Sequence, residues 1–316
     1  MFEKPILFLI FNRPDTTEQV FEIIKKIKPR KLFIAGDGGR NEKDIELCEQ
    51  TRNLVLNNID WDCEVKTLFR QENLGCKMAV SSAINWFFEH VEEGIILEDD
   101  TIPSLSFFEF CEKLLDKYRD DERIMHISGE TGINDQIKGE GYYFCHIPLI
   151  WGWATWKRAW KYFDVTMSEY QNLKSQDFLK KLFPNKFQRQ DWIKSFDMTY
   201  DGSLNSWGFI WTYTVYKKHG LSIIPNTNMV TNIGYDERGT HTFDPNSPCA
   251  NKKRYELNMD FEHPQKIEAD FKKQNRVLIE RFDMLPYFSL NRYEFFKQNK
   301  FKREIIRALY KMGINV

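Results

Sequence analysis

The first half of the chain alternates continuous apolar runs with amphipathic stretches. Apolar runs at residues 5–11, 31–36, 94–97 and 124–128 predict buried strands, and another strand is predicted at 64–69. Apolar residues at helical spacing predict helices at 16–27, 42–58, 75–90 and 104–118. Repeated strand–helix units predict an α/β fold, with a mostly parallel sheet flanked by helices on both faces.

The second half is less regular. Short strands are predicted at residues 142–146, 221–224 and 229–232, and a helix at 204–219. Residues 171–201 are polar and helical without a firm period, and the Trp-rich residues 151–156 are predicted to form a turn. No repeat or low-complexity linker divides the chain, so the pattern does not demand an independent second domain.

Polar side chains follow three of the predicted strands at the point where each ends. They are Asn12 and Arg13, Asp37, and the triplet Glu98, Asp99 and Asp100. The carboxyl ends of parallel strands share one edge of a sheet, where ligands bind. Three neighbouring carboxylates repel one another, and a divalent cation such as Mg²⁺ or Mn²⁺ would compensate them and bridge substrate phosphates. The pattern therefore favours a metal-dependent enzyme that acts on a nucleotide diphosphate.

Composition and charge indicate which partners and which cellular compartment to expect. A net charge of −1, from 45 basic and 46 acidic residues, provides no general field for nucleic acid, which we do not expect as a partner. Six scattered cysteines, no leader-like start and no long apolar segment predict a cytoplasmic protein with reduced thiols. Residues 286–316 carry seven Lys or Arg and two Glu among apolar residues. Such a helix can lie peripherally on the inner face of an anionic membrane or pack on its own domain.

The ordered set of motifs resembles a known family. The strand followed by Asn12-Arg13-Pro14, the strand followed by Gly36-Asp37-Gly38-Gly39, then Asn73-Leu74-Gly75, the acidic triplet and residues 151–156 (WGWATW) resemble GT-A fold nucleotide-diphospho-sugar glycosyltransferases. The resemblance is to the inverting N-acetylglucosaminyltransferase I-like group and its bacterial relatives. It implies a GT-A, Rossmann-like domain at 1–245, with a nucleotide-sugar-binding half (1–130) and an acceptor-side half (131–245). Residues 246–316 would form a C-terminal helical extension.

The resemblance implies roles on the donor side. Asp100 would bind Mn²⁺ or Mg²⁺ directly, and Glu98 and Asp99 would support the metal's waters or the hydroxyls of the donor. Arg13, beside Asn12, would pair with phosphate, and Asp37 would accept from a pyrimidine N–H. Gly75 and Lys77, at the start of a helix, would face the donor. Structural alternatives stay open: a solvated turn for the triplet, a surface ion pair for Arg13, an Asx-type turn for Asp37 and a plain turn glycine for Gly75.

On the acceptor side, Trp151 and Trp153 would stack on sugar rings or serve as core anchors. Relatives place the catalytic Asp directly after a Trp, but Gly208 follows Trp207 here, and no acid occurs at residues 202–235. Asp201 and Glu237 are the nearest candidates for the base that deprotonates the acceptor hydroxyl. His241 would add a metal ligand or a phosphate contact.

Three functions follow from these residues. The leading one is an inverting transferase that moves a hexosyl group from a UDP-sugar, for example UDP-N-acetylglucosamine, to a glycan or glycolipid acceptor in cell-surface polysaccharide synthesis. Gly208 supports the alternative of a catalytically silent protein that binds sugar nucleotides or glycans. A sugar nucleotidyltransferase ranks last, because residues 12–15 are not the Gly-rich basic loop that such enzymes place after the first strand.

Overall fold

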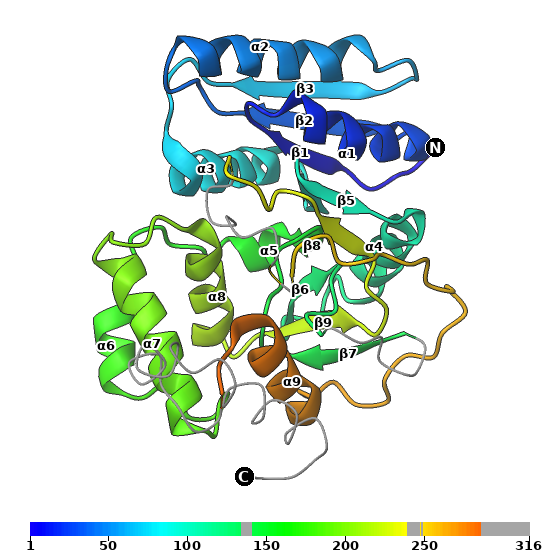
Figure 1. Cartoon of the computed structure of the whole chain (residues 1–316). Coiled ribbons are helices and arrows are strands. Elements are labelled where there is room, and N and C mark those ends of the chain that lie inside the picture. The colour runs from blue at the N-terminus through cyan, green and yellow to red at the C-terminus, as the bar shows by residue number, and fades with distance from the viewer. Residues whose placement is uncertain (134–140, 239–246, 248, 286–316) are drawn as a thin grey trace.

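Among the described residues, eight strands form one mixed sheet in the order β3-β2-β1-β4-β8-β6-β9-β7 (Figure 1). The computed structural model describes residues 1–133, 141–238, 247 and 249–285. Strands β3, β2, β1 and β4 are parallel, as are β6 and β9, whereas β8 and β7 run antiparallel to their neighbours. The strands are β1 (Ile6–Ile10), β2 (Lys31–Gly36), β3 (Glu64–Phe69), β4 (Glu93–Glu98), β6 (Ile124–Ser128), β7 (Tyr142–Cys145), β8 (Trp153–Trp156) and β9 (Leu221–Pro225).

Helices cover both faces of the sheet because strand side chains alternate between two apolar cores. In β1, Leu7 and Leu9 face one core, and Ile6, Phe8 and Ile10 face the other. The first core receives α3 (Gly75–His90), α5 (Lys157–Trp160), α6 (Tyr170–Ser175), α7 (Lys186–Tyr200), α8 (Trp207–Lys217) and α9 (Phe271–Phe282). The second receives α1 (Pro14–Ile27), α2 (Glu42–Asn57) and α4 (Leu105–Lys117). The predicted α/β class and the two helical layers are confirmed.

The prediction of a turn across residues 151–156 was wrong for its second part. Trp153–Trp156 forms β8, which lies inside the sheet between β4 and β6. All four of its residues are buried, so the run carries no alternation that would distinguish a strand from a packed turn. Gly152 precedes it with a φ of 57°, a conformation that glycine adopts without a steric penalty.

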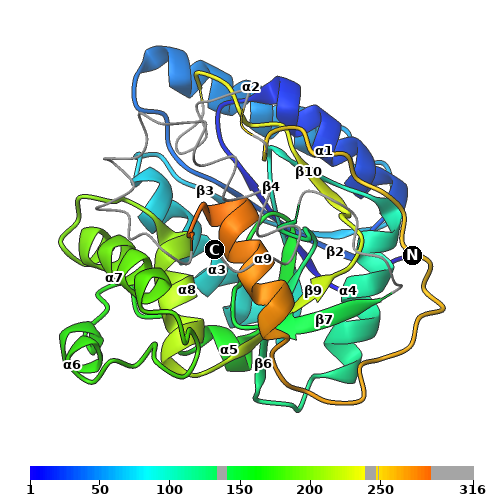
Figure 2. The ribbon, with the colours of Figure 1, turned by 60° about the horizontal axis from the view of Figure 1, so that its bottom comes forward.

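A second, two-stranded sheet connects the halves of the chain. β5 (Thr101–Pro103), directly after the acidic triplet, pairs antiparallel with β10 (Val230–Asn232). Figure 2 shows β10 running beside the region where β4 ends. This pairing carries the residues after Asn232 onto the carboxyl end of β4, which is the edge where the sequence predicts a ligand site.

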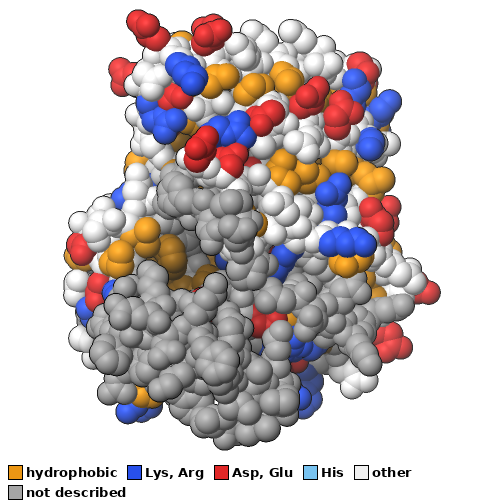
Figure 3. Space-filling view, viewed as in Figure 1, with side chains coloured by type: hydrophobic (Ala, Val, Ile, Leu, Met, Phe, Trp, Pro, Cys, Tyr) orange, Lys and Arg blue, Asp and Glu red, His pale blue; other side chains and the backbone are white. Residues whose placement is uncertain are grey.

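The described residues on the face drawn in Figure 3 mix charges of both signs. There, Lys and Arg side chains are interspersed with Asp and Glu side chains. In the described part of the chain, no helix combines the length and the apolar character that crossing a bilayer requires. The basic tail at 286–316 lies outside the described residues.

Candidate active site

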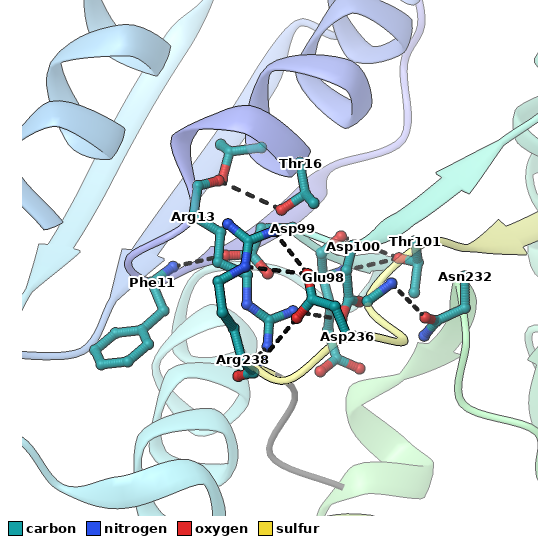
Figure 4. Close-up of polar contacts among 12 residues, drawn as sticks. Phe11, Arg13, Thr16, Glu98, Asp99, Asp100, Thr101, Asn232, Asp236 and Arg238 are labelled. Atoms are coloured by element: carbon teal, nitrogen blue, oxygen red, sulfur yellow. Dashed lines mark hydrogen bonds and ion pairs between the residues drawn. The ribbon is translucent and has the colours of Figure 1, made fainter. Parts of the chain in front are cut away.

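The acidic triplet lies where β4 turns into β5. Glu98 is the last residue of β4, and its backbone N–H and C=O both bond to the Thr101 hydroxyl, at 3.1 and 3.0 Å. Asp99 Oδ2 accepts from the backbone N–H of Phe11 at the end of the adjacent β1, at 2.9 Å. Asp100 Oδ2 lies 3.3 Å from Nη1 of Arg13 (Figure 4). The end of β1 therefore holds two of the three acids.

The triplet carries more negative charge than its surroundings compensate. Burial raises the pKa of Asp99 to about 7, and the charge of Asp100 adds to the rise, whereas Arg13 opposes it. Burial also raises the pKa of Asp100, again against Arg13, and raises that of Glu98 well above its usual value. The Asp100 side chain still retains 18% exposure. One arginine does not neutralise three acids, and a further cation would stabilise their ionised forms.

The segment after β10 closes over Asp100. The backbone N–H of Ile233 donates to the Asp100 carbonyl at 2.8 Å, and that of Gly234 donates to Asn232 Oδ1 at 2.8 Å. A Cβ atom on Gly234 would lie 2.0 Å from Asp100 Oδ2, inside van der Waals contact. A side chain at this position would therefore have to displace the Asp100 carboxylate or the segment that covers it.

Arg13 also connects to the segment that follows. It is 7% exposed, and its Nη2 donates to the carbonyl of Arg238 at 2.6 Å. Arg238 in turn forms a bidentate pair with Asp15, with both distances at 3.0 Å. It also makes a 2.7 Å contact with Asp236 (Figure 4). The start of α1 is thus joined to the segment that covers the triplet.

Asp37 serves the start of α3 in this structure. Its carboxylate accepts from the backbone N–H groups of Leu74 and Gly75, both at 3.0 Å, and from Asn73 Nδ2 at 3.0 Å. These donors include N–H groups at the helix start that have no partner within the helix. Asp37 thus caps α3 from the end of β2, whereas the pyrimidine contact expected from the sequence stays a prediction.

These elements surround a cleft of about 830 Å³ at the carboxyl ends of the parallel strands. It is lined by eight of the predicted site residues: Asn12, Arg13, Asp37, Gly75, Glu98, Asp99, Asp100 and Trp151. Gly208 and Trp207 also line it, as do Asn205, Tyr235 and Arg238. The three strand ends singled out in the sequence therefore converge on one cavity.

Four other predicted residues that the structure describes lie elsewhere. Lys77 does not line the cleft. Trp153 is 1% exposed in the core, stacked on His126 and Trp207, so its position is that of a core anchor. Asp201 is exposed and accepts from Ser203, and Glu237 is exposed, with neither lining the cleft. His241 lies outside the described residues.

Trp151 lines the cleft but its ring is already occupied. The guanidinium of Arg281 lies 4.0 Å from the ring centroid, and Tyr235 meets the ring edge-on at 5.7 Å. A sugar could stack on the face of the Trp151 ring that Arg281 covers only if the Arg281 guanidinium moved away.

Two residues of the cleft were missed in the sequence. Glu130 follows the predicted strand at 124–128 by two residues, so the rule that singled out the other strand ends would have found it. Arg281 comes from α9, which apolar periodicity did not identify. Their contact depends on the tertiary fold alone.

The donor set fits a divalent cation shared with a ligand. In the described residues, no three His, Cys, Asp or Glu side chains gather as a metal site. Mg²⁺ typically takes one or two carboxylates and completes its shell with waters and substrate phosphates. Asp100 faces the cleft beside Arg13, and the triplet needs positive charge, so these oxygens suit such a cation.

Comparisons with known proteins yield likeness in structure alone. No protein-family model matches the chain, and no curated protein matches its sequence. Among solved structures, a mannosyltransferase from Pyrobaculum calidifontis in complex with GDP-Man and Mn²⁺ is similar, at 12% identity and a TM-score of 0.33, over 49% of this chain and 45% of that one. TarS 1–349 from S. aureus is similar at 10% identity and a TM-score of 0.38, over 72% of this chain and 59% of that one.

A 4-diphosphocytidyl-2C-methyl-D-erythritol synthase from Anaerococcus prevotii is also similar, at 10% identity and a TM-score of 0.32, over 55% of this chain and 78% of that one. The chain thus spans less than two thirds of the mannosyltransferase and of TarS. At these identities the likeness is one of fold alone, and the function is argued from the site.

Proposed function

We propose that this chain is a metal-dependent inverting glycosyltransferase that moves a hexosyl group from a UDP-sugar to a glycan or glycolipid. The observation that carries the proposal is the undercompensated acidic triplet beside Arg13, in a cleft of about 830 Å³ at the carboxyl ends of the strands. The resemblance of the ordered motifs to GT-A transferases gives the reaction class.

The residues of the cleft divide between the two substrates. Asp100, supported by Glu98 and Asp99, would hold Mg²⁺ or Mn²⁺, which when bound neutralises charge on a diphosphate. Arg13, fixed by the Arg238 carbonyl, would contact phosphate oxygens, for which its planar donors are suited. Trp151 and Trp207 would form the acceptor side.

The experiment measures UDP release from a panel of UDP-hexoses with Mn²⁺ and without acceptor. We expect slow release by the native protein and a reduction of about 100-fold in Asp100→Asn, equivalent to about 3 kcal/mol of transition-state stabilisation. Asp121→Asn is the control, because Asp121 pairs with Arg123 ahead of β6, at the other end of the sheet. Failure of every UDP-hexose to bind, with Asp100→Asn unchanged, would contradict the proposal.

Gly208 favours a second candidate, a silent sugar-nucleotide-binding protein. It lines the cleft where relatives carry the base, and a Cβ there would lie 2.6 Å from Ile150 Cδ1. The variant Gly208→Asp, which would restore this acid, is therefore combined with Ile150→Val, which removes the Cδ1 methyl group in the way. Tight binding of UDP and Mn²⁺ without turnover of any donor, followed by turnover in the double variant, would support this candidate.

A further inference from the structure

Glu130 is a buried acid of the cleft with an incomplete set of contacts. It is 1% exposed, and neither of its carboxylate oxygens has a hydrogen-bond donor among the described residues. Its ion-pair partner is Arg281, whose Nε lies 3.5 Å from Oε2, too far for a well-formed hydrogen bond. Arg281 is fixed on its other side by stacking on Trp151 at 4.0 Å.

Such an arrangement is costly without a ligand. A buried carboxylate ordinarily accepts several hydrogen bonds, and each missing donor destabilises the folded protein. The positive charge of Arg281 offsets part of that cost, but at 3.5 Å its Nε does not complete a well-formed hydrogen bond to the carboxylate. Because Glu130 lines the cleft, a hydroxyl group of a bound molecule would supply the missing donor.

The sheet register places Glu130 level with the acidic triplet. Ile96 of β4 and Ser128 of β6 both pair with Trp153 of the intervening β8. Glu98 and Glu130 each follow that row by two residues, on strands that are two spacings, or about 10 Å, apart. The acidic triplet and Glu130 therefore lie at the same level of the sheet, on either side of the segment that leads into β8.

The segment at residues 229–233 forms backbone hydrogen bonds beside Glu130 and at Asp100. Gly129 donates to the Gly152 carbonyl at 2.8 Å and accepts from the Met229 N–H at 3.0 Å. Four residues after Met229, Ile233 bonds to Asp100. The distance between the two acids is thus set by backbone contacts, which suits a site that must hold two reacting groups in register.

Among the acids of the cleft, Glu130 is the best placed to accept a proton from an acceptor. Five acidic side chains line the described part of the cleft: Asp37, Glu98, Asp99, Asp100 and Glu130. Asp37 caps α3, and the triplet lies on the metal side. Asp201 and Glu237 do not line the cleft at all. Glu130 is the one remaining acid with free acceptor capacity.

We propose that Glu130 is the catalytic base, an assignment that rests on the proposed transferase function. The acceptor O–H donates to Glu130 and loses its proton to the carboxylate as the acceptor oxygen bonds to the anomeric carbon. The bond from that carbon to the diphosphate oxygen breaks, and its electron pair leaves with UDP. Arg281 is a positioning residue that holds the carboxylate against the wall formed by Trp151. Glu130 thus takes the role that Gly208 leaves vacant.

The test separates proton removal from structure with two nucleophiles. UDP release from UDP-N-acetylglucosamine, UDP-glucose and UDP-galactose with Mn²⁺ is measured in water alone and with added azide. Water must lose a proton to form the product, whereas the azide anion attacks without losing one. In Glu130→Gln we expect water-dependent release to fall by about 100-fold or more, and azide-dependent release to remain near that of the native protein.

Controls exclude misfolding and general loss of binding. Glu92→Gln makes the same chemical change at a side chain that is 81% exposed and paired with Lys157, and it should change neither rate. The affinity of Glu130→Gln for UDP and Mn²⁺, and its thermal midpoint, should match the native protein. Equal loss of both rates, or no loss of either, overturns the assignment of Glu130 alone. Absence of UDP release from the native protein with every donor, in water and in azide, overturns the proposed function itself.

Discussion

Gly234 is a residue-scale determinant of the site because it touches the carboxylate proposed to bind metal. An added Cβ would lie 2.0 Å from Asp100 Oδ2, so Gly234→Ala must displace Asp100 or the segment after β10. We expect a loss of at least about tenfold in Mn²⁺-dependent UDP affinity and a destabilisation of about 1–3 kcal/mol. Calorimetric titration with UDP and Mn²⁺, together with urea unfolding, measures the two effects.

Gly202→Ala provides the matched control. Gly202 has a φ of 85°, but no atom lies within 4 Å of its added Cβ, so the substitution strains the backbone without reaching a ligand. It should cost about 1 kcal/mol of stability and leave UDP affinity unchanged. Unaltered UDP affinity in Gly234→Ala would show that the contact with Asp100 does not position it.

At the scale of elements, the sheet end and α3 depend on Asp37. Its carboxylate accepts from two backbone N–H groups at the start of α3 and from Asn73. Asp37→Ala should lower the free energy of unfolding by about 1–2 kcal/mol, the usual effect of losing a helix cap. Urea denaturation measures it against Asp62→Ala, at an exposed position. A stability equal to that of the native protein would contradict the capping role and favour a role in base recognition.

Elements with a strong local pattern were predictable from sequence, and those set by tertiary pairing were not. β2 and β6 coincide with their predicted runs because a buried parallel strand is apolar throughout. β5 has three residues and exists through its pairing with β10, so no local period predicts it. The turn predicted at β8 was wrong because all four of its residues are buried and show no alternation. The same holds for the site. The acids at the predicted strand ends were identified from the sequence, whereas the contact between Glu130 and Arg281 was not.

At the scale of the whole molecule, convergence on the cleft was predictable, because parallel strands end at one edge. The contribution of the second half was not, since its residues reach the cleft through long-range contacts. The β5–β10 pairing brings Gly234 to Asp100, and α9 brings Arg281 to Glu130. The residues on the proposed donor side can thus be predicted from local sequence, whereas those on the proposed acceptor side come together only through long-range contacts.

The stability of the whole molecule should decline in acid through His126. This side chain projects from β6 and is fully buried against α8, where its Nε2 lies 2.9 Å from the Leu149 carbonyl and its Nδ1 accepts from Trp211 at 3.1 Å. These partners fix a neutral ring, and burial lowers its pKa to about 3. An unfolded histidine titrates near pH 6.5.

Below about pH 6.5 the unfolded chain therefore binds a proton that the native protein excludes. This difference removes about 1.4 kcal/mol of stability for each pH unit down to about pH 3. His126→Gln preserves a donor and an acceptor but cannot titrate. Between pH 6 and 4, the free energy of unfolding of this variant should therefore fall by about 1.4 kcal/mol less per pH unit than that of the native protein. Urea unfolding across this range measures the slopes, with His90→Gln, at an exposed position, as the control. Identical slopes in the native protein and His126→Gln would show that His126 is not what couples folding to acid.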